Sequence, residues 1–131
     1  MVPNVKNAQS KSIFEIAADL ETLKIKGQKG TLSNTDLQQG TITLSNIGNV
    51  GGTGLHPVLV TSELCIGALG KVQRLPRYET INGVETVVPK EVINVSFNAD
   101  HRVIDGATVA RFVQLWKSYL EHPSLLTVNL K

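Results

Sequence analysis

Apolar residues in the first part of the chain recur at three- and four-residue steps, the spacing of one helix face. The pattern runs through Ile13, Ile16, Ala17, Leu20 and Leu23. Ser12 and Glu15 stand in the positions of a capping box, in which each side chain satisfies a free backbone N–H group. We therefore expect a helix that begins after Ser12 and ends near Gly27, followed by a loop or short turn over residues 28–40.

The middle of the chain is rich in β-branched residues and turn signals, which predicts strands. Strands are expected over residues 41–45, 58–60 and 64–74, with a glycine-dense segment over residues 46–54. Asn82-Gly83 predicts a type I′ hairpin, because both residues tolerate the positive φ that this turn requires. The hairpin should join a strand that ends near Glu79 to one that runs from Val84 towards Phe97.

A second helix is predicted from about Gly106 to Glu121, and Pro123 prevents its continuation. Its apolar face carries Val109, Phe112, Val113, Trp116 and Leu120. No internal repeat or linker interrupts the chain, whose 131 residues fit one domain. The order of helix, strands with a hairpin, and helix predicts an α+β fold.

Composition and charge exclude several classes of protein. Hydrophobic residues make up 41% and charged residues 18%, as in a globular core, and the net charge of +2 is spread without a basic stripe, which argues against a nucleic-acid partner. Cys65 is the single cysteine, so the chain forms no internal disulfide. No apolar run is long enough for a membrane span, and the start lacks a signal core, so we expect a cytoplasmic protein or a targeting region outside this sequence.

The segment from Asn98 to Ala107 carries the sharpest chemical signal. It contains His101 between a strand and a helix, where a histidine is suited to accept a proton near neutral pH, and Asp105 follows four residues later. A loop histidine is also commonly structural, and an aspartate before a helix is a natural N-cap. The spacing alone leaves both interpretations open.

Other motifs favour structural roles. The glycines of residues 48–54 lack the spacing of a phosphate loop, and Cys65 between Leu64 and Ile66 is best explained as a small buried residue. His56 and His122 flank prolines in expected turns, and no Cys/His cluster has metal-ligand spacing, so no metal is expected. The glycosylation sequon at Asn94 falls inside an expected strand and is expected to be unused.

Several blocks of the sequence resemble the acyltransferases of the 2-oxoacid dehydrogenase complexes. The block Asp100-His-Arg-Val-Ile-Asp-Gly106 is similar to the active-site signature of this family, and Gly40-Thr-Ile-Thr-Leu-Ser-Asn-Ile-Gly48 with Gly51-Gly52-Thr53 resembles its upstream block. Further likeness in Val2–Asn7, Ser12–Ala17, Ile66–Gly70 and Leu115–Glu121 extends it over essentially the whole chain. The first segment and the Leu115–Glu121 helix are most similar to the branched-chain members.

The resemblance implies a fold like that of chloramphenicol acetyltransferase, a two-layer sandwich with a mixed sheet and helices on one face. Residues 1–131 would be the C-terminal portion of a single, N-terminally incomplete catalytic domain. The implied activity is transfer of a branched-chain acyl group from dihydrolipoyl-lysine to coenzyme A, a co-substrate. The lipoyl group would belong to a domain absent from this chain, and the alternative is a non-catalytic assembly module.

The resemblance also assigns residues and partners. His101 would be the general base, Ser45 a hydrogen-bond donor to the oxyanion, and Asp105 a residue that holds the loop. Substrate or coenzyme A would contact Asn46, Gly48, Gly51 and Gly52. The implied assembly is a homotrimer within a larger core particle that works with decarboxylase and dihydrolipoyl dehydrogenase components, in the mitochondrial matrix or in a bacterial cytoplasm. We expect the apolar tail, residues 125–131, to contact another subunit.

Overall fold

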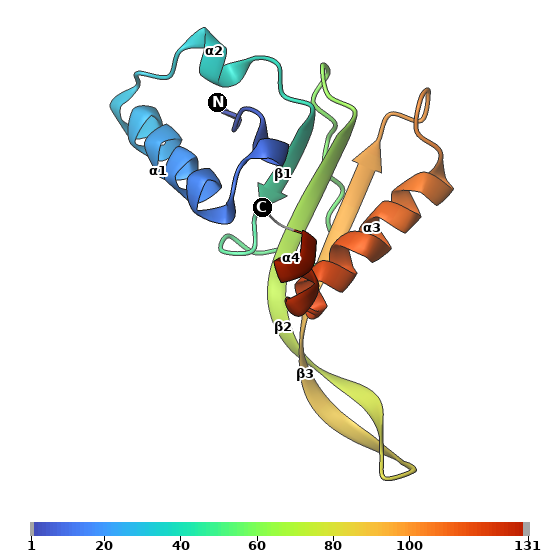
Figure 1. Ribbon diagram of the computed structural model, residues 1–131. Coiled ribbons are helices and arrows are strands. Elements are labelled where there is room, and N and C mark those ends of the chain that lie inside the picture. The colour runs from blue at the N-terminus through green and yellow to red at the C-terminus, as the bar shows by residue number, and fades with distance from the viewer. Residues whose placement is uncertain (1, 130–131) are drawn as a thin grey trace. The chain divides into compact units, whose positions relative to one another are not determined.

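A computed structural model describes residues 2–129 (Figure 1). The chain divides into two compact units, one formed by Met1–Thr41 with Gly106–Lys131 and the other by Ile42–Asp105. The first unit contains helices and the second contains the sheet. The predicted α+β class is therefore confirmed.

The second unit holds one mixed three-stranded sheet in the order β1-β2-β3. Its strands are β1 (Ile42–Asn46), β2 (Cys65–Ile81) and β3 (Val84–Ala99). β1 pairs with β2 in parallel, and β2 pairs with β3 antiparallel. The register aligns Ile42 with Cys65 and Cys65 with Ala99, so the start of β1 and the end of β3 lie at the same end of the sheet.

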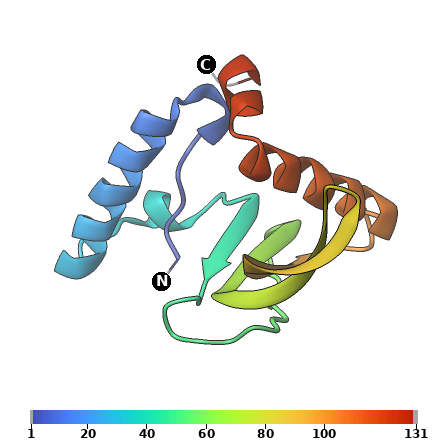
Figure 2. The same cartoon turned by 90° about the horizontal axis from the view of Figure 1, so that it is seen from below.

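The hairpin at Asn82-Gly83 is confirmed. Asn82 has a φ of 51° and Gly83 a φ of 82°, the left-handed conformations that a type I′ turn requires. The two strands run to the turn itself, so β2 and β3 are longer than the sequence predicted. Beyond β1 they continue as a twisted two-stranded ribbon (Figure 2).

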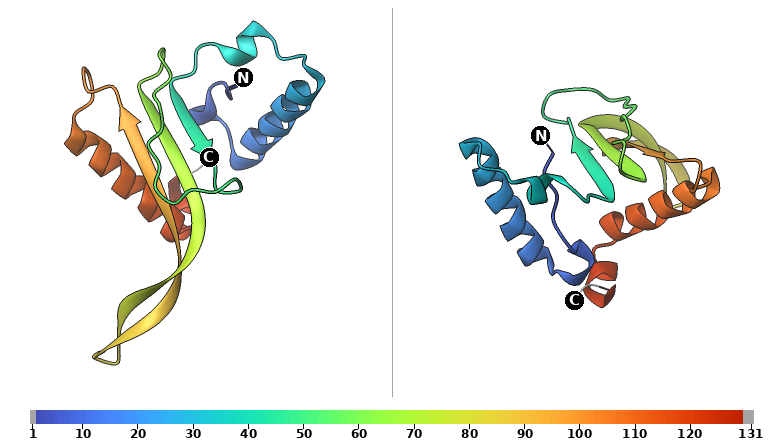
Figure 3. Two further views of the ribbon diagram at one scale, coloured as in Figure 1. Left: turned by 180° about the vertical axis from the view of Figure 1, so that it is seen from behind. Right: turned by 90° about the horizontal axis from the view of Figure 1, so that it is seen from above.

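The strand predicted over residues 58–60 is wrong, since these residues lie in the long connection between β1 and β2. This connection crosses the face of the sheet (Figure 3, left). Its backbone is held there by side chains of β3: Asn94 donates to the Thr53 carbonyl oxygen at 2.7 Å, and Asn98 donates to the Pro57 carbonyl oxygen. The β-branched residues that suggested a strand thus pair with none of the strands of the sheet.

The first unit begins with a short 3-10 helix, η1 (Ala8–Ser10), and α1 (Ile13–Lys29). The capping box of Ser12 and Glu15 is confirmed. The predicted stop at Gly27 is wrong: the helix continues to Lys29, and Gly30 takes the left-handed conformation, with a φ of 67°. A single glycine inside a helix costs only about 1 kcal/mol, which the flanking turns offset.

The region predicted as a loop over residues 28–40 contains a short helix, α2 (Asn34–Leu37). A second capping box forms it, in which Ser33 accepts from the Asp36 N–H and Asp36 accepts from the Ser33 N–H. The Ser33 hydrogen bonds are the main cause that lowers the pKa of Asp36 to about 2, and Lys26 adds an ion pair at 3.1 Å. The three-residue step from Ser33 to Asp36 was the signal that the sequence offered for this helix.

The C-terminal part of the first unit contains α3 (Gly106–Glu121), with the predicted bounds, and α4 (Ser124–Asn129). The expected subunit-contact tail overlaps α4, and its residues 130 and 131 lie outside the described residues. Within the described part of the chain, the buried hydrophobic residues are Leu23, Ile66 and Ala68. Many large apolar side chains are exposed, among them Phe14 at 87% and Leu44 at 59%.

Candidate active site

His101 lies in a tight turn directly after β3. The Asp100 N–H donates to the Leu64 carbonyl oxygen at 2.9 Å, which ties the turn to the segment before β2. The Asp100 carbonyl oxygen accepts from the N–H groups of Val103 and Ile104, at 3.1 and 3.0 Å. The turn therefore closes around His101, whose side chain is exposed.

An ion pair flanks the histidine. The Arg102 guanidinium donates to both carboxylate oxygens of Asp100, from Nε at 2.9 and 3.0 Å and from Nη2 at 2.6 Å. The Arg102 backbone N–H also donates to Oδ1 of Asp100, at 3.0 Å. The side-chain hydrogen bonds from Arg102, followed by the backbone one, lower the pKa of Asp100 to about 2. The Asp100 carboxylate beside His101 is thus ionised, and both of its oxygens accept hydrogen bonds from Arg102.

Ser45 lies on β1 and is half-buried. Its register partner on β2 is Ala68, and the partner of Ala68 on β3 is Ser96. Because register partners point to one face of a sheet, Ser45 shares a face with Ser96 and, by the two-residue alternation, with Asn94 and Asn98. The connection held by these two asparagines therefore covers the face that carries Ser45.

The glycine-dense segment makes a close turn after β1. Asn46 accepts from the Gly48 N–H at 3.0 Å through its side-chain oxygen, and Ile47 accepts from the Gly51 N–H at 3.0 Å through its carbonyl. Gly51 and Gly52 have φ values of 138° and 94°, which other residues rarely adopt. A β-carbon on Gly48 would lie 2.8 Å from the Gly70 carbonyl oxygen. Glycine is thus required by conformation or by space at these positions.

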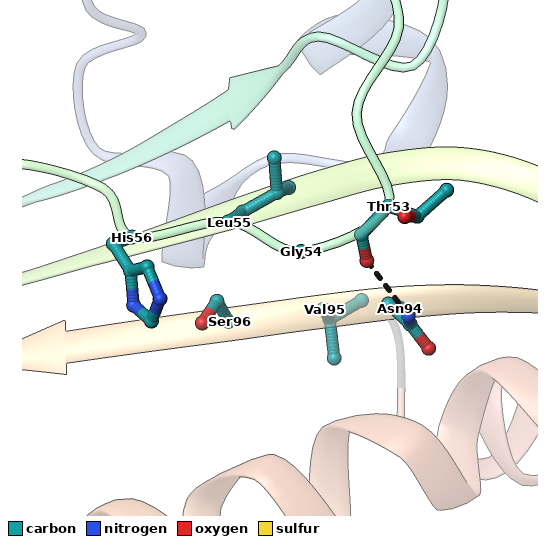
Figure 4. Close-up of a pocket in the computed structure, with 7 residues that line it drawn as sticks. All are labelled: Thr53, Gly54, Leu55, His56, Asn94, Val95 and Ser96. Atoms are coloured by element: carbon teal, nitrogen blue, oxygen red, sulfur yellow. Dashed lines mark hydrogen bonds between the residues drawn. The ribbon is translucent and has the colours of Figure 1, made fainter.

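A pocket of about 290 Å³ opens between this connection and β3 (Figure 4). Its lining includes His56, which points towards Ser96 in the close-up, and the Asn94 side chain that bonds to Thr53. Sequence reasoning assigned His56 a surface or structural role and did not identify this pocket. The proline after His56 and the β3 asparagines are weak signals, because only the folded connection brings them together.

The structure does not bring Ser45 and His101 together within one chain. By register, Ser45 lies three residues along β1 from the level of Ala99 and two strands away from it. Strand geometry converts this to a separation of roughly 14 Å, and His101 lies beyond Ala99. A general base acts over about 3 Å, or through one water. Asp105, by contrast, shares the segment of His101 and immediately precedes α3.

Other candidates are weaker. Burial raises the pKa of the Cys65 thiol, which disfavours the thiolate that a nucleophile needs. Nδ1 of His122 lies 3.2 Å from the Ser118 carbonyl oxygen, a local contact at the end of α3.

Among residues 2–129, no group of three His, Cys, Asp or Glu side chains is placed to hold a metal ion. Within the same residues, the helices are all too short or too polar to cross a membrane.

Residues 1–128 match the family described as 2-oxoacid dehydrogenases acyltransferase (catalytic domain). The chain belongs to this family. It is 53% identical over its whole length to the mitochondrial lipoamide acyltransferase component of the branched-chain alpha-keto acid dehydrogenase complex of Bos taurus. The component of the same name in Caenorhabditis elegans is 49% identical over the whole chain.

Two solved structures also resemble this chain. A dihydrolipoamide acetyltransferase of Azotobacter vinelandii superposes with a TM-score of 0.84 at 29% identity, over 99% of this chain and 51% of that one. That structure was determined to investigate a serine, a histidine and an asparagine in its catalytic mechanism. The cubic core of the pyruvate dehydrogenase multienzyme complex gives a TM-score of 0.84 at 28% identity, with 99% and 51% of the two chains covered. The chain spans about a quarter of the Bos taurus relative, 27% of its length.

Proposed function

We propose that residues 1–131 form the C-terminal portion of a single acyltransferase catalytic domain. Its reaction transfers a branched-chain acyl group from a dihydrolipoyl-lysine thioester to coenzyme A. The family membership supports acyl transfer, and the names of the Bos taurus and Caenorhabditis elegans relatives support the branched-chain substrate. The lipoyl group is carried on a domain outside these residues.

His101 acts as the general base. It removes the proton from the coenzyme A thiol, whose ordinary pKa near about 8.5 leaves it mostly protonated at neutral pH. The thiolate attacks the thioester carbonyl and forms a tetrahedral intermediate, which collapses to acyl-coenzyme A and dihydrolipoyl-lysine. The exposed position of His101 at the tip of its turn supports this role, because both substrates must reach it.

Ser45 donates a hydrogen bond to the oxyanion of that intermediate, and Asp105 holds the His101 loop. The Azotobacter vinelandii enzyme supports the set, because its asparagine follows its histidine by four residues, as Asp105 follows His101. This chain differs from that enzyme in having an aspartate, Asp105, where that enzyme has the asparagine. Loss of an oxyanion donor costs about 2.7–4 kcal/mol of barrier, so Ser45 carries a large share of catalysis in this proposal.

One observation carries the proposal further: Ser45 and His101 are too far apart in one chain to act on one carbonyl. The site is therefore built from two copies, with Ser45 of one copy and His101 of another, in a homotrimer that assembles into a larger core. The solved cubic core, itself an assembly, supports this arrangement. The exposed apolar side chains, Phe14 and Leu44 among them, supply surface for such contacts.

The glycine-dense turn completes the site. Asn46, Gly48, Gly51 and Gly52 follow Ser45 in the turn after β1, and at Gly51 nothing lies within 4 Å of the β-carbon position, so a ligand could approach the backbone there. We assign them to coenzyme A or acyl-group binding. The complex would also contain decarboxylase and dihydrolipoyl dehydrogenase components. The mitochondrial names of the relatives support the mitochondrial matrix as the location.

The second candidate function is a non-catalytic assembly module. The extent of exposed apolar surface favours it, because the described residues bury few large side chains by themselves. An activity measurement on assembled protein separates the two functions.

A complementation experiment tests the proposal. His101→Ala and Ser45→Ala variants of the complete catalytic domain are each expected to be inactive in transfer from an acyl-dihydrolipoamide to coenzyme A. Unfolding and refolding the two together should restore activity, because about a quarter of the sites in randomly mixed trimers pair an intact histidine with an intact serine. If the refolded mixture of the two variants has the correct particle mass but regains no transfer activity, a site shared between two subunits is contradicted. Activity of His101→Ala within a few-fold of the parent would contradict the assignment of the base.

A further inference from the structure

The residues on either side of His101 form a closed unit of their own. Asp100 precedes the histidine and Arg102 follows it, and the two are joined by three guanidinium contacts and one backbone N–H contact. His101 is therefore the middle residue of a ring that its neighbours close. A residue enclosed in this way has fewer backbone conformations to lose when substrate binds.

The exposure of the two partners is unequal. The Asp100 side chain is 14% exposed to solvent, whereas the Arg102 side chain is 87% exposed. An arginine this exposed would ordinarily gain little from a surface ion pair. Here the guanidinium meets the carboxylate through two nitrogens at 2.6–3.0 Å, the two-pronged geometry that gives arginine pairs their directionality.

The backbone of Asp100 anchors this unit to the sheet. Its N–H bonds to Leu64 next to β2, and its carbonyl oxygen takes the N–H groups of Val103 and Ile104. Every hydrogen-bonding group of Asp100 is thus used to hold the turn. Because these hydrogen bonds of Asp100 fix the backbone of the turn, they also fix the position from which the His101 side chain projects.

Charge gives the arginine a second use. A bare carboxylate one residue from His101 would oppose the thiolate and the oxyanion, since both are negative. Arg102 neutralises that carboxylate where it stands. An aspartate can then serve as the anchor of the turn without weakening the chemistry beside it.

We propose that Asp100 and Arg102 act together as positioning residues that fix the His101 turn and cancel the charge of its anchor. Neither contacts the reacting atoms. The inference rests on the proposed function, because it assigns a purpose to the orientation of His101 in acyl transfer.

The test uses substitutions in the complete catalytic domain, assembled in its normal particle. Asp100→Asn keeps an oxygen for the Arg102 N–H but removes the charge, Asp100→Ala removes both, and Arg102→Ala frees the carboxylate. Asp100→Ala and Arg102→Ala should each lower kcat by roughly ten- to a hundred-fold, with KM for coenzyme A changed by less than about two-fold. The double alanine variant should be no slower than Asp100→Ala, because the two side chains act as one unit. Arg102→Lys, which keeps a cation, should recover part of kcat.

Arg77→Ala is the matched control. Arg77 is also exposed and in the sheet unit, and among the described residues its guanidinium donates to the adjacent Pro76 carbonyl oxygen at 3.0 Å. Its kcat should equal that of the parent. Particle mass and thermal unfolding are measured for every variant, and Asp100→Asn keeps the test available if Asp100→Ala fails to fold.

The outcomes separate this inference from the proposed function. If His101→Ala is inactive while Asp100→Ala and Arg102→Ala are as fast as the parent, only the positioning role fails. The role also fails if the losses in the double variant multiply, or if kcat falls only in proportion to the folded, assembled fraction. If His101→Ala remains active, the proposed function fails and takes this inference with it.

Discussion

Gly48 offers the sharpest test of how tightly the turn after Ser45 is packed. A β-carbon at this position would lie 2.8 Å from the carbonyl oxygen of Gly70 and 3.4 Å from its carbonyl carbon. The obstacle is backbone, so no side-chain rotation relieves the clash. Gly70 has little room to retreat, because its own Cβ position lies 3.1 Å from the Gly52 carbonyl oxygen and 3.2 Å from that of Asn94. Gly48→Ala must therefore move either β2 or the turn.

The expected cost follows from this geometry. Overpacking of a fixed interior typically costs 1–3 kcal/mol. For a domain of 150–250 residues, about 1 kcal/mol lowers the melting temperature by roughly 2–4 °C, so we expect a decrease of about 2–12 °C. The turn also holds Asn46 through the Gly48 N–H, so KM for coenzyme A should rise.

Gly54→Ala is the matched control in the same connection. Its added β-carbon would meet nothing within 4 Å, and its φ is not in the left-handed region. Such a substitution is neutral or stabilises by up to about 1 kcal/mol, because it restricts the unfolded chain. Calorimetry of both variants in the complete catalytic domain gives the comparison. Equal melting temperatures for Gly48→Ala, Gly54→Ala and the parent would refute the packing argument.

Three further predictions concern other parts of the chain. Ser45→Ala should lower kcat by roughly 10²–10³-fold with little change in KM; a raised KM at constant kcat would make Ser45 a binding residue instead. Cys65→Ala should cost about 1–2 kcal/mol of stability in denaturant unfolding and leave transfer intact, and a loss equal to that of His101→Ala would contradict this. Deletion of residues 125–131 should reduce the large particle to smaller oligomers in light scattering, so large particles without the tail would exclude it as the link.

Local chemistry explains which elements were predictable. The capping box at Ser12, the Asn82-Gly83 turn and the helix over residues 106–121 each depend on neighbours in sequence, and all three are confirmed. The end of α1 was misplaced because two glycines, Gly27 and Gly30, compete as stops. Only the second has the positive φ that closes the helix, and nothing in the local sequence decides between them.

Long-range bonding explains what was not predictable. Residues 58–60 have the composition of a strand, yet they lie in the connection that crosses the face of the sheet and pair with none of its three strands. The asparagines that hold their connection, Asn94 and Asn98, come some forty residues later. The pocket beside His56 has the same origin, since the connection and β3 create it jointly. A reader of the sequence meets these partners in separate segments with no pattern that links them.

The strand register gives the candidate site its most demanding property. Because β2 separates β1 from β3, Ser45 and His101 belong to one sheet but lie two strands apart. Ser45 is near the end of β1, whereas the turn of His101 lies beyond the level of Ile42, where β1 starts. A rigid sheet cannot bend by the roughly 14 Å that would bring them together. If both groups act on one carbonyl, a second copy must supply one of them, and activity then depends on subunit concentration as well as on residue identity. Dilution of the assembled enzyme below its dissociation constant should abolish transfer while each separate chain keeps its fold, whereas a site contained in one chain would keep its specific activity at every dilution.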